Sequence, residues 1–353
     1  MTKIHIITLS LLISSLSLFA QNQEIPSEDY WKYHELICKA ETAFFLEYNE
    51  DSCLYYYNLA FKTFSFNYVH DLVNAAQIAC YSKKEYKSYI YKGLKFGLKS
   101  SHLKKVPILT TTGIISEIEN YEKTPEYLKI RQKYLSGINF EYLSWIYNLG
   151  IEDQIEQKKS NYAVYSLNYI NSLISKIKQN GFPSNKTIGI ECKNIFAEAK
   201  REETDLHKRT GSYPQLDYYK TDDDILSQHF IMVLLHHRGC SYTELKDILL
   251  GEIAKGNLHP REFGFIYDRQ CQYELKANNS FHANCPKLAK ENGVFRIGST
   301  LISNTIDSIE CSQSKVNALR AKYSIVPLEV DKMKKVYEKQ YGFKFFWGFW
   351  DCL

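Results

Sequence analysis

Residues 43–61 read AFFLEYNEDSCLYYYNLAF, and residues 76–94 read AQIACYSKKEYKSYIYKGL. Laying one stretch on the other aligns Ala43 with Ala76, Tyr48 with Tyr81, Tyr56 with Tyr89, Ala60 with Gly93, and Phe61 with Leu94. Small residues therefore recur where two helices would cross closely, and aromatic residues recur where a wider gap must be filled. The offset of 33 residues is close to the ~34-residue period of tetratricopeptide-type helical hairpins. These stretches predict a stack of paired helices.

Apolar residues recur at helical spacing along most of the chain. In the first part we expect helices at about 29–48, 51–64, 68–82, 85–98, 112–120, 125–137 and 139–149. In the second part we expect them at about 162–180, 187–208, 225–238, 243–255, 262–276 and 328–341. Gly150 and the charged run 151–160 separate the two parts. The predicted fold class is all-α, with tetratricopeptide-like hairpins over 21–150 and a mainly helical domain over 151–353.

Two aromatic features bear on packing. Residues 341–350 contain seven aromatic side chains, which would form a large exposed apolar patch unless this tail folds back over a helix face. The consecutive residues Tyr55, Tyr56 and Tyr57 cannot all face inward on one helix. We therefore expect a buried aromatic C-terminal tail and at least one exposed tyrosine in the triplet.

The first residues resemble an export signal. Lys3 precedes an apolar run over 4–19, and Ala20 comes just before a polar stretch. This pattern predicts a signal peptide over 1–20, cleaved after Ala20, and an exported protein that is periplasmic or extracellular. An uncleaved N-terminal anchor is the alternative. No later run reaches the ~18 apolar residues needed to span a bilayer, so we expect no membrane span after the signal peptide.

Charge and composition narrow the partners. The formal net charge of +4 over 353 residues is too small and too evenly spread to favour nucleic acid. The 28 tyrosines crowd the first half of the chain, and their rings and hydroxyls suit contact with a peptide or a glycan. We expect a protein or peptide partner through the helical-hairpin region, and packing between helices is the alternative role for these rings.

The chain has nine cysteines, an odd number that leaves at least one thiol unpaired within the molecule. One or two disulfides and a set of thiols buried in helices both fit this pattern. His237 with Cys240 and His282 with Cys285 offer four zinc ligands, but their separation matches no finger or ribbon spacing. We predict neither a metal nor a cofactor.

Five short motifs lie in order between residues 151 and 340. They are Asp153-Gln154, Gly181-Phe182-Pro183, Leu234-Leu235-His236-His237, Phe265-Ile266-Tyr267-Asp268-Arg269 and Val316-Asn317-Ala318-Leu319-Arg320. Their order and spacing resemble an uncharacterised bacterial family known only as a domain of unknown function. The resemblance implies a mainly helical domain, commonly preceded by a tetratricopeptide-like region, with no established activity.

The resemblance also points to particular residues. His237 matches the family's histidine, and Asp268 with Arg269 matches its Asp-Arg pair. Gly239 stands where the family usually has an acidic residue, which places an activity of this chain in doubt.

Two functions follow as hypotheses. The first is a protein- or ligand-binding scaffold module, because no phosphate-binding glycine loop and no serine elbow occurs in the sequence. The second is a hydrolase or transferase in which Asp268 orients His237 for proton transfer and Arg269 binds an anionic group. Alternatively, Asp268 and Arg269 tie neighbouring helices together and His237 ends its helix. We therefore expect a binding protein rather than an enzyme.

Overall fold

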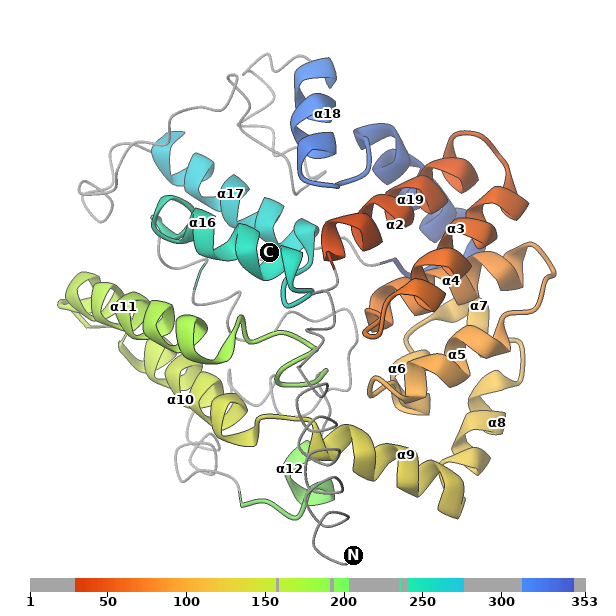
Figure 1. Ribbon diagram of the computed structural model, residues 1–353, viewed down its shortest axis with the longest axis horizontal. Helices are drawn as coiled ribbons and strands as arrows, with labels where there is room; N and C mark the ends of the chain where they lie inside the picture. Colours follow the sequence, from red (N-terminus) through yellow and green to blue (C-terminus); the bar gives the residue numbers. More distant parts are fainter. Residues whose placement is uncertain are drawn as a thin grey trace, which may run out of the picture.

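The computed structural model describes residues 29–156, 159–190, 194–202, 235, 240–275 and 313–345. Within these residues every regular element is a helix and no strand occurs (Figure 1). The predicted all-α class is therefore confirmed. The first helices are α2 (Tyr30–Phe45), α3 (Glu50–Thr63), α4 (Val69–Tyr81), α5 (Lys87–Leu94), α6 (Ser100–Leu103), α7 (Pro107–Thr110), α8 (Ile114–Tyr121) and α9 (Pro125–Ser136). The others are α10 (Phe140–Glu156), α11 (Tyr162–Asn180), α12 (Ile195–Glu198), α16 (Ser241–Ala254), α17 (Pro260–Leu275), α18 (Gln313–Lys322) and α19 (Leu328–Tyr341).

The first four helices form two packed pairs, α2 with α3 and α4 with α5. Short connections make neighbouring helices antiparallel, and Asn49 ends the first connection by accepting a 2.9 Å hydrogen bond from the N–H of Ser52. Ala43, Ala60 and Ala76 are all buried, as expected for residues at close helix crossings. The likeness of these pairs to tetratricopeptide repeats stays a prediction.

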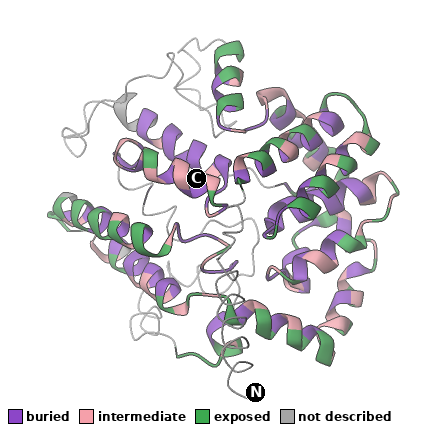
Figure 2. Ribbon diagram, viewed as in Figure 1, coloured by how far each residue is buried: buried purple, intermediate pink, exposed green. Residues whose placement is uncertain are grey.

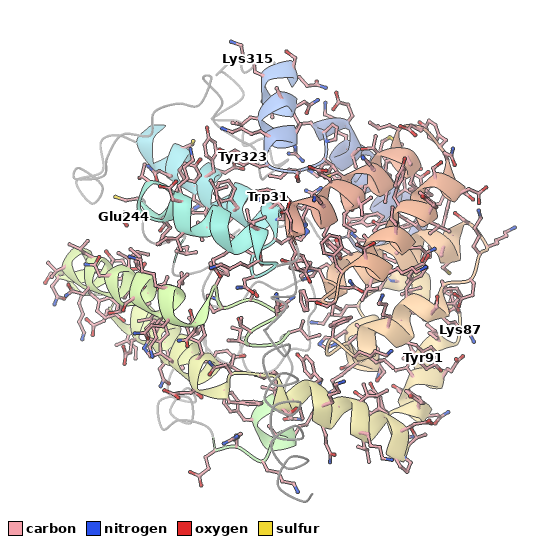
Figure 3. All side chains as sticks on the ribbon, in the orientation of Figure 1. Trp31, Lys87, Tyr91, Glu244, Lys315 and Tyr323 are labelled. Atoms are coloured by element: carbon pink, nitrogen blue, oxygen red, sulfur yellow. The ribbon has the colours of Figure 1, made fainter. Side chains whose placement is uncertain are left out.

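The described apolar residues form two cores. One core joins α2–α9 to α19, and the other joins α10, α11, α12, α16, α17 and α18. Figure 2 shows that α11 is exposed along one side and buried along the other. Helix α10 runs through Gly150, so the expected boundary falls inside a helix. Along the described chain the first core gives way to the second between Tyr127 and Leu135, and Ile190 and α19 return to the first core. Trp31 of α2 packs on the second core, beside α16 in Figure 3.

The aromatic tail packs on the N-terminal helices. Phe343 and Phe345 are 2% and 1% exposed, and the Phe345 ring centroid lies 5.4 Å from that of Phe45. The amide side chain of Gln77 donates to the carbonyl of Lys344 at 2.9 Å and accepts from its N–H at 2.6 Å. The expectation that the tail folds back is confirmed for Phe343 and Phe345, whereas Tyr341 at the end of α19 is 44% exposed, and residues 346–350 lie outside the described part.

The tyrosine triplet divides as helical geometry requires. Tyr55 is 62% exposed, whereas Tyr57 is completely buried. Tyr56 is partly buried and packs against the first core. The prediction of at least one exposed tyrosine is confirmed.

The helix expected at 187–208 is wrong over its described residues. Only α12 is helical there, and the backbone turns at Gly189 (φ 81°) and Asn194 (φ 143°). The N–H of Ile190 donates to the hydroxyl of Tyr134 at 2.9 Å instead of entering a helix. A tertiary contact thus overrides local helical propensity. Apart from Leu235, the helix expected at 225–238 lies outside the described residues.

Residues 1–20, predicted to be a signal peptide, lie outside the described residues. Of the helices that are described, none combines the length and the apolar character that crossing a bilayer requires.

Candidate functional site

A groove of about 540 Å³ opens between α9 and the segments that follow α3, α5 and α11. Its described lining consists of Ser65, Phe66, Lys95, Phe96, Ile130, Lys133, Tyr134, Gly137, Ile138, Asn185 and Lys186. This volume lies in the range of small-molecule sites, roughly 300–1,000 Å³. We call this feature the basic groove, because its described lining includes three lysines and no Asp or Glu.

The walls of the basic groove are aromatic and held in place. The rings of Phe66 and Phe96 meet edge to face, with centroids 5.4 Å apart. The Tyr134 hydroxyl accepts the hydrogen bond from Ile190, and the guanidinium carbon of Arg131 lies 4.9 Å from the Tyr134 ring centroid. Rings fixed in this way lose little conformational freedom when a ligand binds.

Two glycines make room for Tyr134. A Cβ at Gly97 would lie 2.3 Å from the ring carbon Cζ of Tyr134, and a Cβ at Gly189 would lie 2.5 Å from its hydroxyl oxygen. Both glycines also have positive φ angles, 101° and 81°, which other residues adopt only with strain. No local sequence pattern marks Tyr134, because both contacts depend on distant parts of the chain.

The three lysines of the basic groove differ in their surroundings. The ammonium of Lys186 donates to the carbonyl of Lys255 at 2.7 Å and lies 5.1 Å from the ring centroid of Tyr30. Lys95 and Lys133 are exposed, and in the part of the chain that the structure describes neither forms an ion pair. Their charges are therefore open to a ligand in the groove.

A second polar feature lies inside the protein, where five helices meet. It consists of Glu41 from α2, Asp71 from α4, Arg261 from α17, Arg320 from α18, and Asp331 and Lys334 from α19. Each of these side chains is at most 5% exposed. We call them the buried ionic cluster. Its three carboxyl groups equal its three cationic groups in number, and such pairing offsets the cost of burying charge.

Asp331 is the most heavily paired carboxylate of the buried ionic cluster. It accepts two hydrogen bonds from Arg261, at 2.6 and 3.2 Å, and another from Arg320. Burial alone would raise the pKa of Asp331, but the charges of Arg261 and Arg320 outweigh burial and lower it to about 2. Asp331 is therefore ionised at neutral pH.

Asp71 has weaker partners and behaves oppositely. Burial and the nearby charge of Glu41 raise the pKa of Asp71 to about 7. Its Oδ2 accepts a 2.9 Å hydrogen bond from the hydroxyl of Tyr33, and its Oδ1 lies 3.9 Å from the Nε2 of His259. Burial lowers the pKa of His259 well below its usual value, so this imidazole stays neutral and does not compensate the Asp71 charge.

The cavity beside the buried ionic cluster measures only about 10 Å³, which is about enough for one water molecule. The cluster therefore has no room for a substrate. Its contacts join α19 to α2 and α17, and we assign it a structural role. One signal for it was present in the sequence, since Glu41 follows Tyr33 and Ile37 at four-residue spacing on the apolar side of its helix.

Two of the three predicted site residues, Asp268 and Arg269, are described by the structure, and neither belongs to the basic groove. Asp268 is buried in α17. Burial lowers the pKa of the nearby Arg320, and the negative charge of Asp268 acts in the opposite direction. Arg269 is partly exposed, and both residues take part in other interactions. Neither lines the groove or the small cavity. His237 lies outside the described residues, so the three-residue site stays a prediction.

The structure shows the bonding state of the described cysteines. Cys240 is disulfide-bonded, and its partner lies outside the described residues. Cys38, Cys53, Cys80 and Cys271 are free thiols. A sulfur in a disulfide cannot serve as a zinc thiolate, so the zinc alternative involving Cys240 is wrong. Among the described residues, no group of three His, Cys, Asp or Glu side chains is arranged to hold a metal.

Comparison with protein-family models, curated proteins and solved structures found no match to this chain. The resemblance to a bacterial family of unknown function therefore remains a prediction from its motifs.

Proposed function

We propose that this protein is an exported binding module and that the basic groove is its ligand site. The carrying observation is the groove itself, a cavity of about 540 Å³ with fixed aromatic walls and two exposed lysines that form no ion pair among the described residues. Export is supported by the N-terminal leader pattern and by the disulfide at Cys240, because disulfides persist mainly in oxidising compartments.

The chemistry of the lining favours binding over catalysis. The described lining contains no His, Cys, Asp or Glu, which are the side chains that most often transfer protons or attack a substrate. The hydroxyl of Tyr134 already accepts from the backbone. The groove provides apolar surface and positive charge, and both of these features bind a molecule without reacting with it.

A substitution that fills the groove tests this proposal. Gly137 lies at the groove with φ −85°, and a Cβ there would approach no atom closer than 3.4 Å, so Gly137→Trp adds bulk without backbone strain. The matched control is Gly251→Trp, since a Cβ at Gly251 meets nothing within 4 Å and this residue does not line the groove. Both variants should unfold thermally close to the wild type.

The readout is ligand-observed NMR with a fragment library of neutral, cationic and anionic aromatic compounds. We expect fragments that bind the wild type and Gly251→Trp but not Gly137→Trp. A wild type that binds no fragment, or fragments whose signals are unaffected by Gly137→Trp, would contradict the proposal.

A further inference from the structure

The basic groove combines two kinds of surface that select a ligand with two matching parts. Resting on the function proposed above, we infer that its ligand is a small organic anion with a planar apolar body, carrying a carboxylate or a phosphate at one end. The basis for this ligand class is the charge complementarity between an anion and the lysines of the groove.

The apolar part of the ligand would lie between the two sides of the groove. Phe66 and Phe96 form one side, and Ile130, Tyr134 and Ile138 come from the other, along α9 and its C-terminal turn. Flat rings pack well against aromatic faces and edges, which contribute about 0.5–1.5 kcal/mol beyond the area that they bury. A body of this shape excludes water from the groove.

The charged part of the ligand would face Lys95 and Lys133. These lysines come from separate segments, the turn after α5 and helix α9, and both line the groove. With no carboxylate in the described lining, their charges add within the groove, and an apolar wall strengthens their attraction for an anion. The ammonium of lysine is a compact charge and lacks the planar, two-pronged donor geometry of arginine. It can therefore bind a carboxylate or a phosphate equally well.

Matched naphthalene probes separate charge from shape. We would measure by calorimetry the binding of 2-naphthoate, 2-naphthyl phosphate and the neutral 2-naphthamide to the full chain. The two anions should bind about 10-fold or more tightly than the amide, which is the scale of one charge-assisted hydrogen bond. This advantage should shrink at high salt. A larger advantage for one anion identifies the preferred head group.

The variants locate the effect. Lys95→Gln/Lys133→Gln should remove most of the affinity advantage of both anions over the amide and leave the amide unchanged, with Lys186 as the remaining cation of the lining. Lys315→Gln is the control, because Lys315 is exposed on α18, at the opposite end of the molecule from α9 in Figure 3. Gly137→Trp should abolish binding of all three probes.

The possible failures are distinguishable. If the amide and the anions bind equally well to the wild type, the inference is wrong and the binding function stands. The same holds if the double lysine variant keeps the anion preference. If fragments of other kinds bind in the groove but no naphthalene probe does, the inference alone falls. If nothing binds, the proposed function falls with it.

Discussion

The ammonium of Lys334 donates a 2.6 Å hydrogen bond to the carboxylate of Glu41 across 293 residues of sequence. Both side chains are buried, at 0% and 4% exposure. A charge removed from water depends on its partner, so this contact adds to the packing of Phe44 and Phe45 on Tyr337 in tying the last described helix to the first one.

Removing one partner of this pair should be costly. Lys334→Met leaves Glu41 buried, and its remaining polar partners among the described residues are Asn74 at 3.4 Å and the more distant Arg261 at 3.9 Å. We expect the free energy of unfolding in urea to fall by about 3–5 kcal/mol, the usual cost of an uncompensated buried charge. The double variant Glu41→Met/Lys334→Met should recover most of this loss. A double variant that is less stable than Lys334→Met would show that the pair is not the cause.

The buried carboxyl of Asp71 should make stability depend on pH. Its pKa of about 7 in the folded protein exceeds the ordinary value of 3.8. Stability from this group is therefore fully present below the ordinary pKa and is lost as pH rises through about 7. The described titratable groups that interact with it are Glu41, Tyr33, Tyr57, Tyr68, His259, Arg261 and Lys334.

Asp71→Asn removes this titration. We would measure the free energy of unfolding in urea at several pH values between about 5 and 8. The unfolding free energy of the variant minus that of the wild type should rise by up to about 1.4 kcal/mol per pH unit as the pH approaches 7, and should stay constant above that pH. Burial lowers the pKa of His34 to about 3, so His34 costs stability as pH falls below its ordinary value of 6.5. That effect is common to both proteins and cancels in the difference. A difference that stays constant with pH would refute the assignment.

The fit of Tyr134 against Gly97 should tolerate no added methyl group. Gly97→Ala combines a positive φ with a Cβ only 2.3 Å from the tyrosine ring, and we expect it to cost about 2–4 kcal/mol in unfolding free energy. Gly251→Ala is the matched control in helix α16, where the added Cβ meets nothing within 4 Å. It should be stabilising by about 0.5–1 kcal/mol. Equal effects of the two substitutions would contradict the packing described for Tyr134.

The aromatic tail should contribute to stability through Phe345. Phe345→Ala empties a site that contacts Phe45 and Phe343, and we expect a loss of about 3–5 kcal/mol in thermal or chemical unfolding. The control Tyr55→Ala removes a ring that is 62% exposed and should cost no more than about 0.5 kcal/mol. A small effect of Phe345→Ala would mean that the tail is not part of the core.

The local pattern of apolar residues was enough to predict the bounds of helices that have one clearly apolar face. The expected spans 162–180 and 328–341 agree with α11 and α19 to the residue, because a 3.6-residue period is a property of neighbouring residues. The same reasoning failed at 187–208, where the positive φ angle of Gly189 and the hydrogen bond from the N–H of Ile190 to the hydroxyl of Tyr134 turn the backbone away from a helix. The pattern of neighbouring residues contains no information about a hydroxyl group that is distant in sequence.

The sequence by itself determined the all-helical class of the described residues and the burial of Phe343 and Phe345, since both follow from which side chains must leave water. Only the tertiary structure decided which helices meet. The basic groove is built from 65–66, 95–96, 130–138 and 185–186, and the buried ionic cluster pairs residue 41 with residue 334. Periodicity identifies the face that a helix buries but not its partner, because the partner is selected by shape and charge fit between surfaces that are far apart along the chain.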